Sequence, residues 1–156
     1  MMKTITRLAA IFAVAAFSLA CGSNEDKSIS IAGEWKLYSV AGVPVESMDE
    51  AYRTEVYINF VGDGTFEMFQ KLGEGRYRLY TGTYATAGNI VSGTYSDGKA
   101  WGSTYQTAKE GSQLTLTSQN ANAEVCVYDS CTIPGSVRSE ATVATKGSDT
   151  EDQRFL

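Results

Sequence analysis

The chain of 156 residues contains no histidine. Histidine is the side chain whose ordinary pKa lies closest to neutral pH, and it is the usual general base of Ser-His-Asp and Cys-His systems. Neither of these nucleophilic systems can therefore be assembled, and a histidine proton shuttle is excluded as well. The absence also argues against a zinc site, because zinc in proteins is held mainly by cysteine and histidine.

Basic residues are scarce, with 13 Lys and Arg against 18 Asp and Glu. Lys3 and Arg7 fall within the first 20 residues, so a chain cut after residue 20 keeps 11 basic and 18 acidic residues and a formal net charge of −7. The sequence contains no basic cluster. This balance argues against nucleic acid as a partner and against electrostatic adhesion to anionic lipid.

The start of the chain has the pattern of an export signal. Lys3 and Arg7 precede 13 mostly apolar residues from Leu8 to Ala20, and small residues stand around the end of this run. The run is too short to span a bilayer as a mature helix. A cleaved signal peptide over residues 1–20 is therefore favoured over an anchor helix.

Cys21 directly follows the small residue Ala20, and this arrangement resembles the lipobox of bacterial lipoproteins. One difference is Ser18, which stands three positions before the cysteine where the common pattern has Leu. The resemblance implies that Cys21 is acylated, with palmitate among its chains, and becomes the new N-terminus. Two or three acyl chains hold a small domain on a membrane at about 0.8 kcal/mol per buried CH₂. The alternative is a secreted protein cut near Ala20.

Residues 21–29 are polar and acidic and are expected to form a solvated tether after the lipidated cysteine. An acidic patch at this place is similar to the export signal of Bacteroidetes surface lipoproteins. The expected location is the bacterial cell envelope, as an outer-membrane lipoprotein, with surface exposure left open. The remaining length suits one domain with a core. We expect this domain over residues 30–135, followed by a strap or tail over residues 136–156.

The mature chain predicts an all-β fold. Only two prolines interrupt it, and apolar residues alternate in short runs between turn signals spaced about 8 to 12 residues apart. A closed, eight-stranded, antiparallel up-and-down barrel buries this alternation most simply and leaves no exposed edge. We also expect a short helix or lid over residues 47–53, capped by Ser47. The expected strands are residues 31–40, 54–60, 65–72, 76–84, 90–95, 100–107, 114–119 and 124–132.

Gly33-Glu34-Trp35 on the first expected strand has the Gly-x-Trp pattern of lipocalins. With the surrounding motifs, residues 30–135 resemble the lipocalin-like domains of Bacteroidetes lipoproteins. The resemblance implies that Trp35 packs over the closed end of the barrel against an arginine of the last strand. Arg138 and Arg154 both lie beyond that strand. Independently of this resemblance, a Trp35 side chain that faces inward on the first strand is expected to be part of the hydrophobic core. The other motifs are Gly64-Thr65-Phe66, Gly82-Thr83-Tyr84, Gly88-Asn89-Ile90, Gly93-Thr94-Tyr95-Ser96-Asp97-Gly98 and Leu114-Thr115-Leu116.

Aromatic residues concentrate in the middle strands and their turns. Together with the resemblance, they predict a membrane-anchored binding protein that holds a small apolar or amphipathic ligand inside the barrel. Two alternatives stay open: the rings simply fill the interior, or outward rings contact a glycan or serve an inhibitor-like surface. The pocket candidates are Tyr77, Tyr84, Tyr95, Trp101 and Tyr105.

Cys126 and Cys131 are the only cysteines in the expected domain, which enters an oxidising compartment. A turn at residues 128–130 would bring their Cα atoms within the range of a disulfide, and we expect that bond, with two free thiols as the alternative.

Carboxylates are the remaining chemical groups. Glu67, Glu74, Asp97 and Glu110 have no context that distinguishes them from solvated charges, and Asp63 and Asp97 precede glycines in expected turns. Calcium would need several more oxygens. We therefore expect no enzyme, no metal and no cofactor, and we keep a carboxylate- or tyrosine-based activity as a remote alternative.

Overall fold

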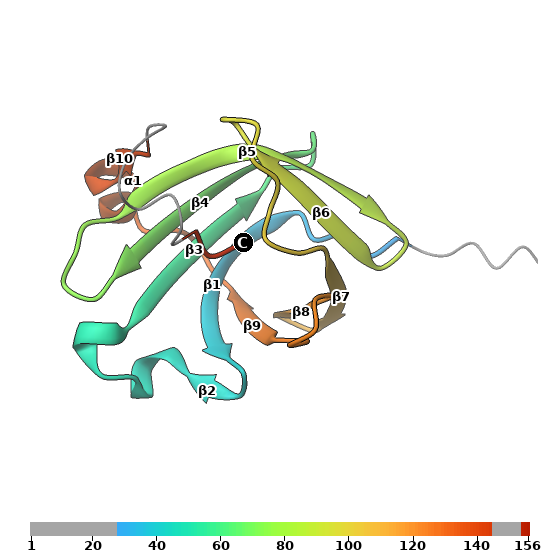
Figure 1. Cartoon of the computed structure of the whole chain (residues 1–156). Helices are drawn as coiled ribbons and strands as arrows, with labels where there is room; N and C mark the ends of the chain where they lie inside the picture. Colours follow the sequence, from blue (N-terminus) through green and yellow to red (C-terminus); the bar gives the residue numbers. More distant parts are fainter. Residues whose placement is uncertain (1–27, 145–153) are drawn as a thin grey trace, which may run out of the picture.

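The computed structural model describes residues 28–144 and 154–156 (Figure 1). The expected signal peptide, Cys21 and most of the tether lie outside the described residues, as do residues 145–153. The elements are β1 (Gly33–Val40), β2 (Val43–Pro44), η1 (Val45–Ser47), η2 (Glu50–Tyr52), β3 (Thr54–Phe60), β4 (Thr65–Leu72), β5 (Arg78–Ala87), β6 (Ile90–Tyr95), β7 (Tyr105–Glu110), β8 (Gln113–Ser118), β9 (Val125–Ser130), α1 (Gly135–Glu140) and β10 (Thr142–Val143).

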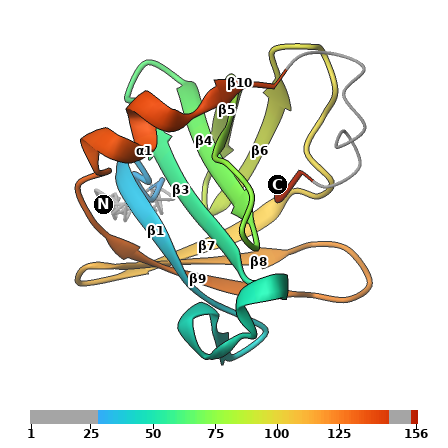
Figure 2. The ribbon, with the colours of Figure 1, turned by 90° about the vertical axis from the view of Figure 1, so that its left-hand side faces the viewer.

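Strands β1 and β3–β9 form a closed barrel. Their order is β5-β4-β3-β1-β9-β8-β7-β6, and β5 also pairs with β6, which closes the ring. Every pair in this ring is antiparallel. Strands that are neighbours in the barrel follow one another along the chain, except that β9 returns to β1 (Figure 2). The predicted eight-stranded up-and-down barrel is confirmed.

Three strands coincide with their predicted ranges, namely β3, β4 and β6. The strand predicted over residues 100–107 is wrong at its start, because β7 begins only at Tyr105. The chain between β6 and β7 folds back instead, and the main-chain N–H of Trp101 donates to the carbonyl oxygen of Gly93 at 3.0 Å. A Cβ atom on Gly93 would lie 2.2 Å from the Trp101 ring, so the missing side chain makes room for the indole.

The segment after β1 forms the expected short helical lid, as two 3₁₀ turns, η1 and η2. Its capping differs from the prediction. The side chain of Asp49 accepts from the N–H of Ala51 at 3.0 Å, whereas the hydroxyl of Ser47 donates to the carbonyl oxygen of Pro44 at 2.7 Å. Asp49 therefore takes the role that the sequence assigned to Ser47.

Helix α1, which the sequence did not predict, lies on the outside of the barrel (Figure 2). It buries Val137 against an outer cluster on β3 and β4. Arg138 fixes the helix to the wall, with its guanidinium 2.6 Å from Glu34 and 3.0 Å from Glu67. After the helix, β10 pairs in parallel with β5. The buried members of the outer cluster are Tyr57, Phe69, Tyr77, Ile133 and Val137.

Trp35 marks one end of the barrel, which we call the closed end. Its side chain is 2% exposed, and the indole N–H donates to the carbonyl oxygen of Ile31 at 2.9 Å. The cation over its ring is Lys109 of β7, with Nζ 5.3 Å from the ring centroid. The partner is thus a lysine, whereas Arg138 and Arg154 pair with carboxylates elsewhere.

The opposite end is the open end, where β1 finishes and Val40 lies opposite Cys126 of β9. The connections from β1 to β3, β6 to β7 and β8 to β9 meet there. Between the two ends the interior is packed with rings in tilted and edge-to-face contacts, with centroids 5.0–6.3 Å apart. The interior rings in these contacts are Phe60, Phe66, Tyr80, Tyr84, Tyr95, Trp101 and Tyr105.

Candidate functional site

Residues 154–156, which we call the strap, enter the open end of the barrel. The hydroxyl of Tyr95 donates to the main-chain oxygen of Leu156 at 2.6 Å. The N–H of Phe155 donates to the side-chain oxygen of Gln70 at 3.0 Å. Leu156 is buried and Phe155 packs against the inner cluster. The strap therefore covers part of the barrel mouth with apolar side chains.

Arg154 attaches the strap to the connection between β6 and β7. Its guanidinium forms an ion pair with Asp97 and lies 4.5 Å from the centroid of the Tyr95 ring. Asp97 also accepts from the N–H of Lys99 at 3.0 Å, so it caps its turn as the sequence predicted. The side-chain hydrogen bonds from Arg154, with help from this backbone N–H, lower the pKa of Asp97 to about 2.

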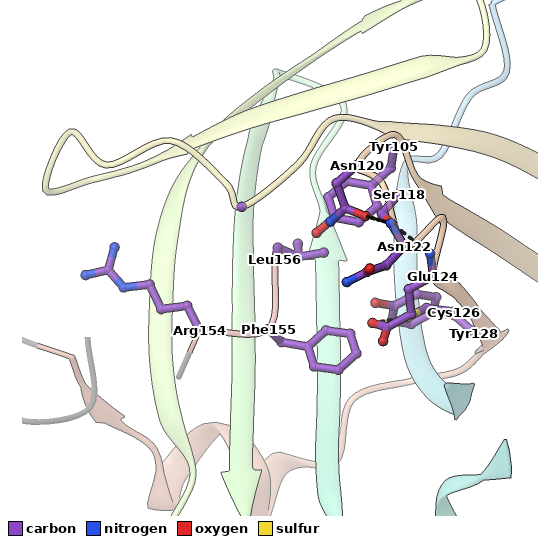
Figure 3. A pocket seen from close by; sticks show the side chains of 11 residues that line it. Tyr105, Ser118, Asn120, Asn122, Glu124, Cys126, Tyr128, Arg154, Phe155 and Leu156 are labelled. Carbon is purple, nitrogen blue, oxygen red and sulfur yellow. Dashed lines mark hydrogen bonds between the residues drawn. The ribbon is translucent and has the colours of Figure 1, made fainter. Parts of the chain in front are cut away.

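A cavity of about 230 Å³ remains between the strap and strands β7–β9. Figure 3 shows Glu124, Cys126 and Tyr128 along one side of it and the side chains of Phe155 and Leu156 on the other, while the Arg154 side chain points away. We call this cavity the mouth pocket. Its lining residues are Gly102, Tyr105, Ser118, Asn120, Asn122, Glu124, Cys126, Tyr128, Arg154, Phe155 and Leu156.

The connection between β8 and β9 gives the mouth pocket an ordered polar rim. The side-chain oxygen of Asn120 accepts from the hydroxyl of Ser118 at 3.0 Å and from the N–H of Asn122 at 3.1 Å. The Ser118 hydroxyl in turn accepts from the N–H of Glu124 at 2.8 Å. These local hydrogen bonds are typical of Asx turns, and the N–H of Gln119 also donates to Ser103 and Thr104 of the connection between β6 and β7.

Tyr128 is the most deeply buried polar group of the mouth pocket. It is 0% exposed, and its hydroxyl has no hydrogen-bond partner. Burial raises the pKa of Tyr128 well above its usual value. Burial, and then the charge of Glu124, raises the pKa of the Cys126 thiol to about 12. These two groups are neutral at pH 7, and they offer hydrogen bonds and not charge.

The aromatic residues predicted to line a pocket lie in different places in the structure. Tyr105 lines the mouth pocket. Tyr84 and Trp101 fill the barrel below it, and the Tyr84 hydroxyl donates to the carbonyl oxygen of Val61 at 2.7 Å. Tyr95 is also interior, but its hydroxyl is engaged by the strap.

The prediction for Tyr77 is wrong. It lies outside the barrel in the outer cluster, and its hydroxyl donates to Glu55 at 2.7 Å. Helix α1 and the segment before it bury this outer face, and an outward tyrosine there is as buried as an inward one. Burial of Glu55 raises its pKa, but hydrogen bonds from Tyr77 and Lys71 outweigh this and the net pKa is lowered.

Most lining residues of the mouth pocket were missed at the sequence level. Tyr128 and Cys126 both face inward on β9, and the alternation with Val125 and Val127 was the available signal. The sequence predicted a strand over residues 124–132, but the expected disulfide between Cys126 and Cys131 would have needed a turn within it at residues 128–130. Asn120 and Asn122 were correctly placed in a turn, but nothing in a turn motif says that its side chains border a cavity.

The prediction of a disulfide between Cys126 and Cys131 is wrong, because both thiols are free. The turn that this bond would need at residues 128–130 is not formed, because β9 continues through these residues to Ser130. Five residues along a strand span about 16 Å, far beyond the reach of a disulfide. Cys126 faces the inner cluster, whereas Cys131 packs against the outer cluster.

The outer surface of the middle strands carries no row of aromatic rings within the described residues. The large exposed aromatics are Tyr38 on β1 and Tyr52 on η2, which are 48% and 83% exposed. A shallow groove of about 510 Å³ lies over β4, β5 and β6, and its outward side chains are mainly threonines. The stacking platform expected for a glycan-contacting surface is therefore missing there.

Within residues 28–144 and 154–156, no three His, Cys, Asp or Glu side chains gather where they could hold a metal ion. In the same residues, no helix has the length and apolar character needed to cross a bilayer. Among the residues that the structure describes, Glu124 is the only carboxylate side chain on the lining of the mouth pocket. A pair of converging carboxylates is thus not found at this site.

In the comparison with known proteins, the chain matches the model of a family described as the lipocalin-like domain. The match covers residues 31–116, which is more than half of the chain and includes the Gly-x-Trp motif at Gly33 and Trp35. Neither the curated proteins nor the solved structures compared with it give a match. A lipocalin-like barrel suggests ligand binding in general, in place of catalysis. From this match and its closed eight-stranded barrel, the chain belongs to the lipocalin-like family.

Proposed function

We propose that this protein is a membrane-anchored binding protein of the bacterial cell envelope that holds a small amphipathic ligand in the mouth pocket. The anchor is the lipid on Cys21, inferred from the lipobox-like sequence around that residue. The ligand site is the cavity between the strap and β7–β9. The single observation that carries the proposal is the buried, unpartnered hydroxyl of Tyr128 at the side of this cavity.

A buried hydroxyl without a partner costs about 1–3 kcal/mol, so such groups are rare and call for an explanation. A ligand atom that hydrogen-bonds to Tyr128 supplies one. The apolar part of the same ligand would contact Phe155 and Leu156 on the opposite side. One polar anchor facing an apolar wall suits an amphipathic molecule better than a purely apolar one.

Native mass spectrometry of the full-length chain, released from detergent micelles after purification from its own host, tests this proposal. We expect extra mass that disappears when the same sample is denatured, and fragmentation identifies the cargo. The Tyr128→Phe variant should retain less of it, whereas Tyr38→Phe, on the outer surface, should retain it fully. A bare mass for the native chain together with no ligand signal in Tyr128→Phe would contradict the proposal.

A further inference from the structure

Among the described residues, the lining of the mouth pocket carries one acidic side chain, that of Glu124. Glu124 lies at its rim, and no cation among the described residues stands within ion-pair distance of its carboxylate. Its carboxylate accepts a long hydrogen bond from the Cys126 thiol, at 4.0 Å. A carboxylate beside a partly enclosed cavity attracts positive charge and repels negative charge.

Arg154, the one cationic side chain among the described lining residues, does not neutralise Glu124. Arg154 is paired with Asp97, and its guanidinium lies over the rings of Tyr80 and Tyr95. Figure 3 shows its side chain directed away from Glu124. The charge of Arg154 is therefore used to hold the strap, and the charge of Glu124 remains for a ligand.

The other polar side chains that line the mouth pocket add no charge to it. Burial raises the pKa of Tyr105 to about 12. The pKa of Cys126 is raised to about 12 as well. Tyr105, Cys126 and Tyr128 are thus neutral near pH 7, and the unpartnered Tyr128 hydroxyl can accept a hydrogen bond from an N–H group.

Aromatic rings complete the surroundings of the pocket. Tyr105 and Tyr128 lie on the barrel side and Phe155 on the strap side. Ring faces attract cations and also pack well against an apolar or aromatic body. The volume of about 230 Å³ is below the roughly 300–1,000 Å³ of drug-sized sites, so the occupant must be small.

From the lone carboxylate, the orphaned tyrosine hydroxyl and the aromatic walls, we infer that the mouth pocket binds a small organic cation, in which an ammonium group lies between Glu124 and Tyr128 and an apolar body packs against Phe155. This inference rests on the proposed function and specifies the chemical class of the ligand. The charge of the ligand is a property that the match to the lipocalin-like family does not specify.

Three probes of the same skeleton test it: 2-phenylethylamine, 2-phenylethanol and 3-phenylpropionate, which are cationic, neutral and anionic at pH 7. Binding is measured by calorimetric titration of the full-length chain in detergent micelles, with empty micelles as the blank. We expect the amine to bind at least about tenfold more tightly than the alcohol, and the acid to show no binding. Added salt should weaken the binding of the amine and leave the binding of the alcohol unchanged.

Glu124→Gln should reduce the affinity for the amine by about tenfold and leave the affinity for the alcohol unchanged. Glu110 is an exposed carboxylate at the end of β7. The matched control is therefore Glu110→Gln, which should bind the amine with the affinity of the parent. Tyr128→Phe should also weaken amine binding. It should not lower the free energy of unfolding, because the hydroxyl that it removes has no hydrogen-bond partner in the protein. This second variant tests the site even if Glu124→Gln folds poorly.

Equal affinity for the amine and the alcohol, or tighter binding of the acid, would overturn the inference while leaving the proposed binding function in place. Unchanged amine binding in Glu124→Gln would overturn it in the same way. If none of the probes binds and no cargo appears in native mass spectrometry, the proposed function fails together with it. Amine selectivity that depends on Glu124 and not on Glu110 supports the inference.

Discussion

The hydroxyl of Tyr95 donates to the main-chain oxygen of Leu156, 61 residues further along the chain, at 2.6 Å. Both residues are buried. The bond joins the last residue of β6 to the strap, and the ion pair between Arg154 and Asp97 lies beside it. Together with the hydrogen bond from the N–H of Phe155 to Gln70, these two contacts hold the strap in the barrel mouth.

Tyr95→Phe removes this hydrogen bond while keeping the ring in the core. We expect it to lower the free energy of unfolding by about 1 kcal/mol, because the strap oxygen loses its donor in a buried place. Urea denaturation of the chain from Ser28 onward, which retains every contact described, measures the change. Tyr38→Phe on the outer surface should have no effect, and an equal loss in both variants would speak against a role of the bond.

Asp97→Asn should alter the dependence of stability on pH. The pKa of Asp97 is lowered to about 2 from an ordinary value of 3.8, so the folded state favours the ionised carboxylate. Its contribution is complete above about pH 4 and is lost as the pH falls towards 2. The difference in urea midpoint between the parent and Asp97→Asn should therefore shrink from pH 5 to pH 2.

Because Glu55 and Glu67 also have lowered pKa values, the parent alone would not isolate Asp97. The comparison with the variant removes their common contribution. Glu110→Gln serves as the control, and its difference from the parent should follow a different course. A difference between parent and Asp97→Asn that stays constant from pH 5 to pH 2 would show that the ion pair does not contribute.

Trp35→Ala should lower the free energy of unfolding by about 3–5 kcal/mol, the loss typical of a large buried ring. The indole is almost fully buried, its N–H donates to Ile31, and Lys109 stands over its ring. Chemical denaturation measures the effect. Tyr38→Ala on the same strand is the exposed control, with an expected change of less than about 0.5 kcal/mol. A loss below about 1 kcal/mol in Trp35→Ala would refute its role in the core.

Gly93→Ala should destabilise the fold by about 1–3 kcal/mol, because the new methyl group would meet the Trp101 ring at 2.2 Å. The cost should fall when Trp101 is changed to Phe in the same chain, since the smaller ring leaves room. Gly102→Ala is the matched control, with no atom within 4 Å of the added Cβ. Similar losses in Gly93→Ala and Gly102→Ala would point to chain flexibility and not to the indole contact.

The two cysteines of the barrel should remain thiols under non-reducing conditions. We expect no mass change on reduction, and we expect Cys131 to react with a thiol reagent faster than Cys126. Cys126 is buried and its pKa is raised to about 12, whereas Cys131 is half-buried. Intact mass spectrometry with timed labelling checks both points. A gain of two hydrogens on reduction would restore the disulfide that the sequence suggested.

Local patterns predicted the barrel well. The hairpin of β3 and β4 was readable because Val56, Ile58 and Phe60 alternate inward and the turn that follows is stabilised within itself. In that turn, the carboxylate of Asp63 accepts from the N–H of Thr65 at 2.9 Å. Such features depend on neighbours in sequence, and the sequence contains them fully.

The site was much less predictable, because it depends on contacts between distant segments. The period of two tells which side chains share a face, but not whether the outer face is also covered, as it is at Tyr77. Nothing local indicates that Phe155 and Leu156 enter the barrel, since the contacts that place them come from Gln70 and Tyr95. The helix α1 was missed for a similar reason, as its six residues depend on the wall that they cover.

The described chain enters at the closed end of the barrel, where the Ser28 hydroxyl donates to Thr86 and the Ser30 carbonyl oxygen accepts from Lys109. The mouth pocket lies at the other end. If the lipid on Cys21 holds the protein on a membrane, the tether joins the barrel at the end remote from the mouth, and the mouth remains open to the surrounding water. Cargo would then enter and leave the mouth pocket through the surrounding water.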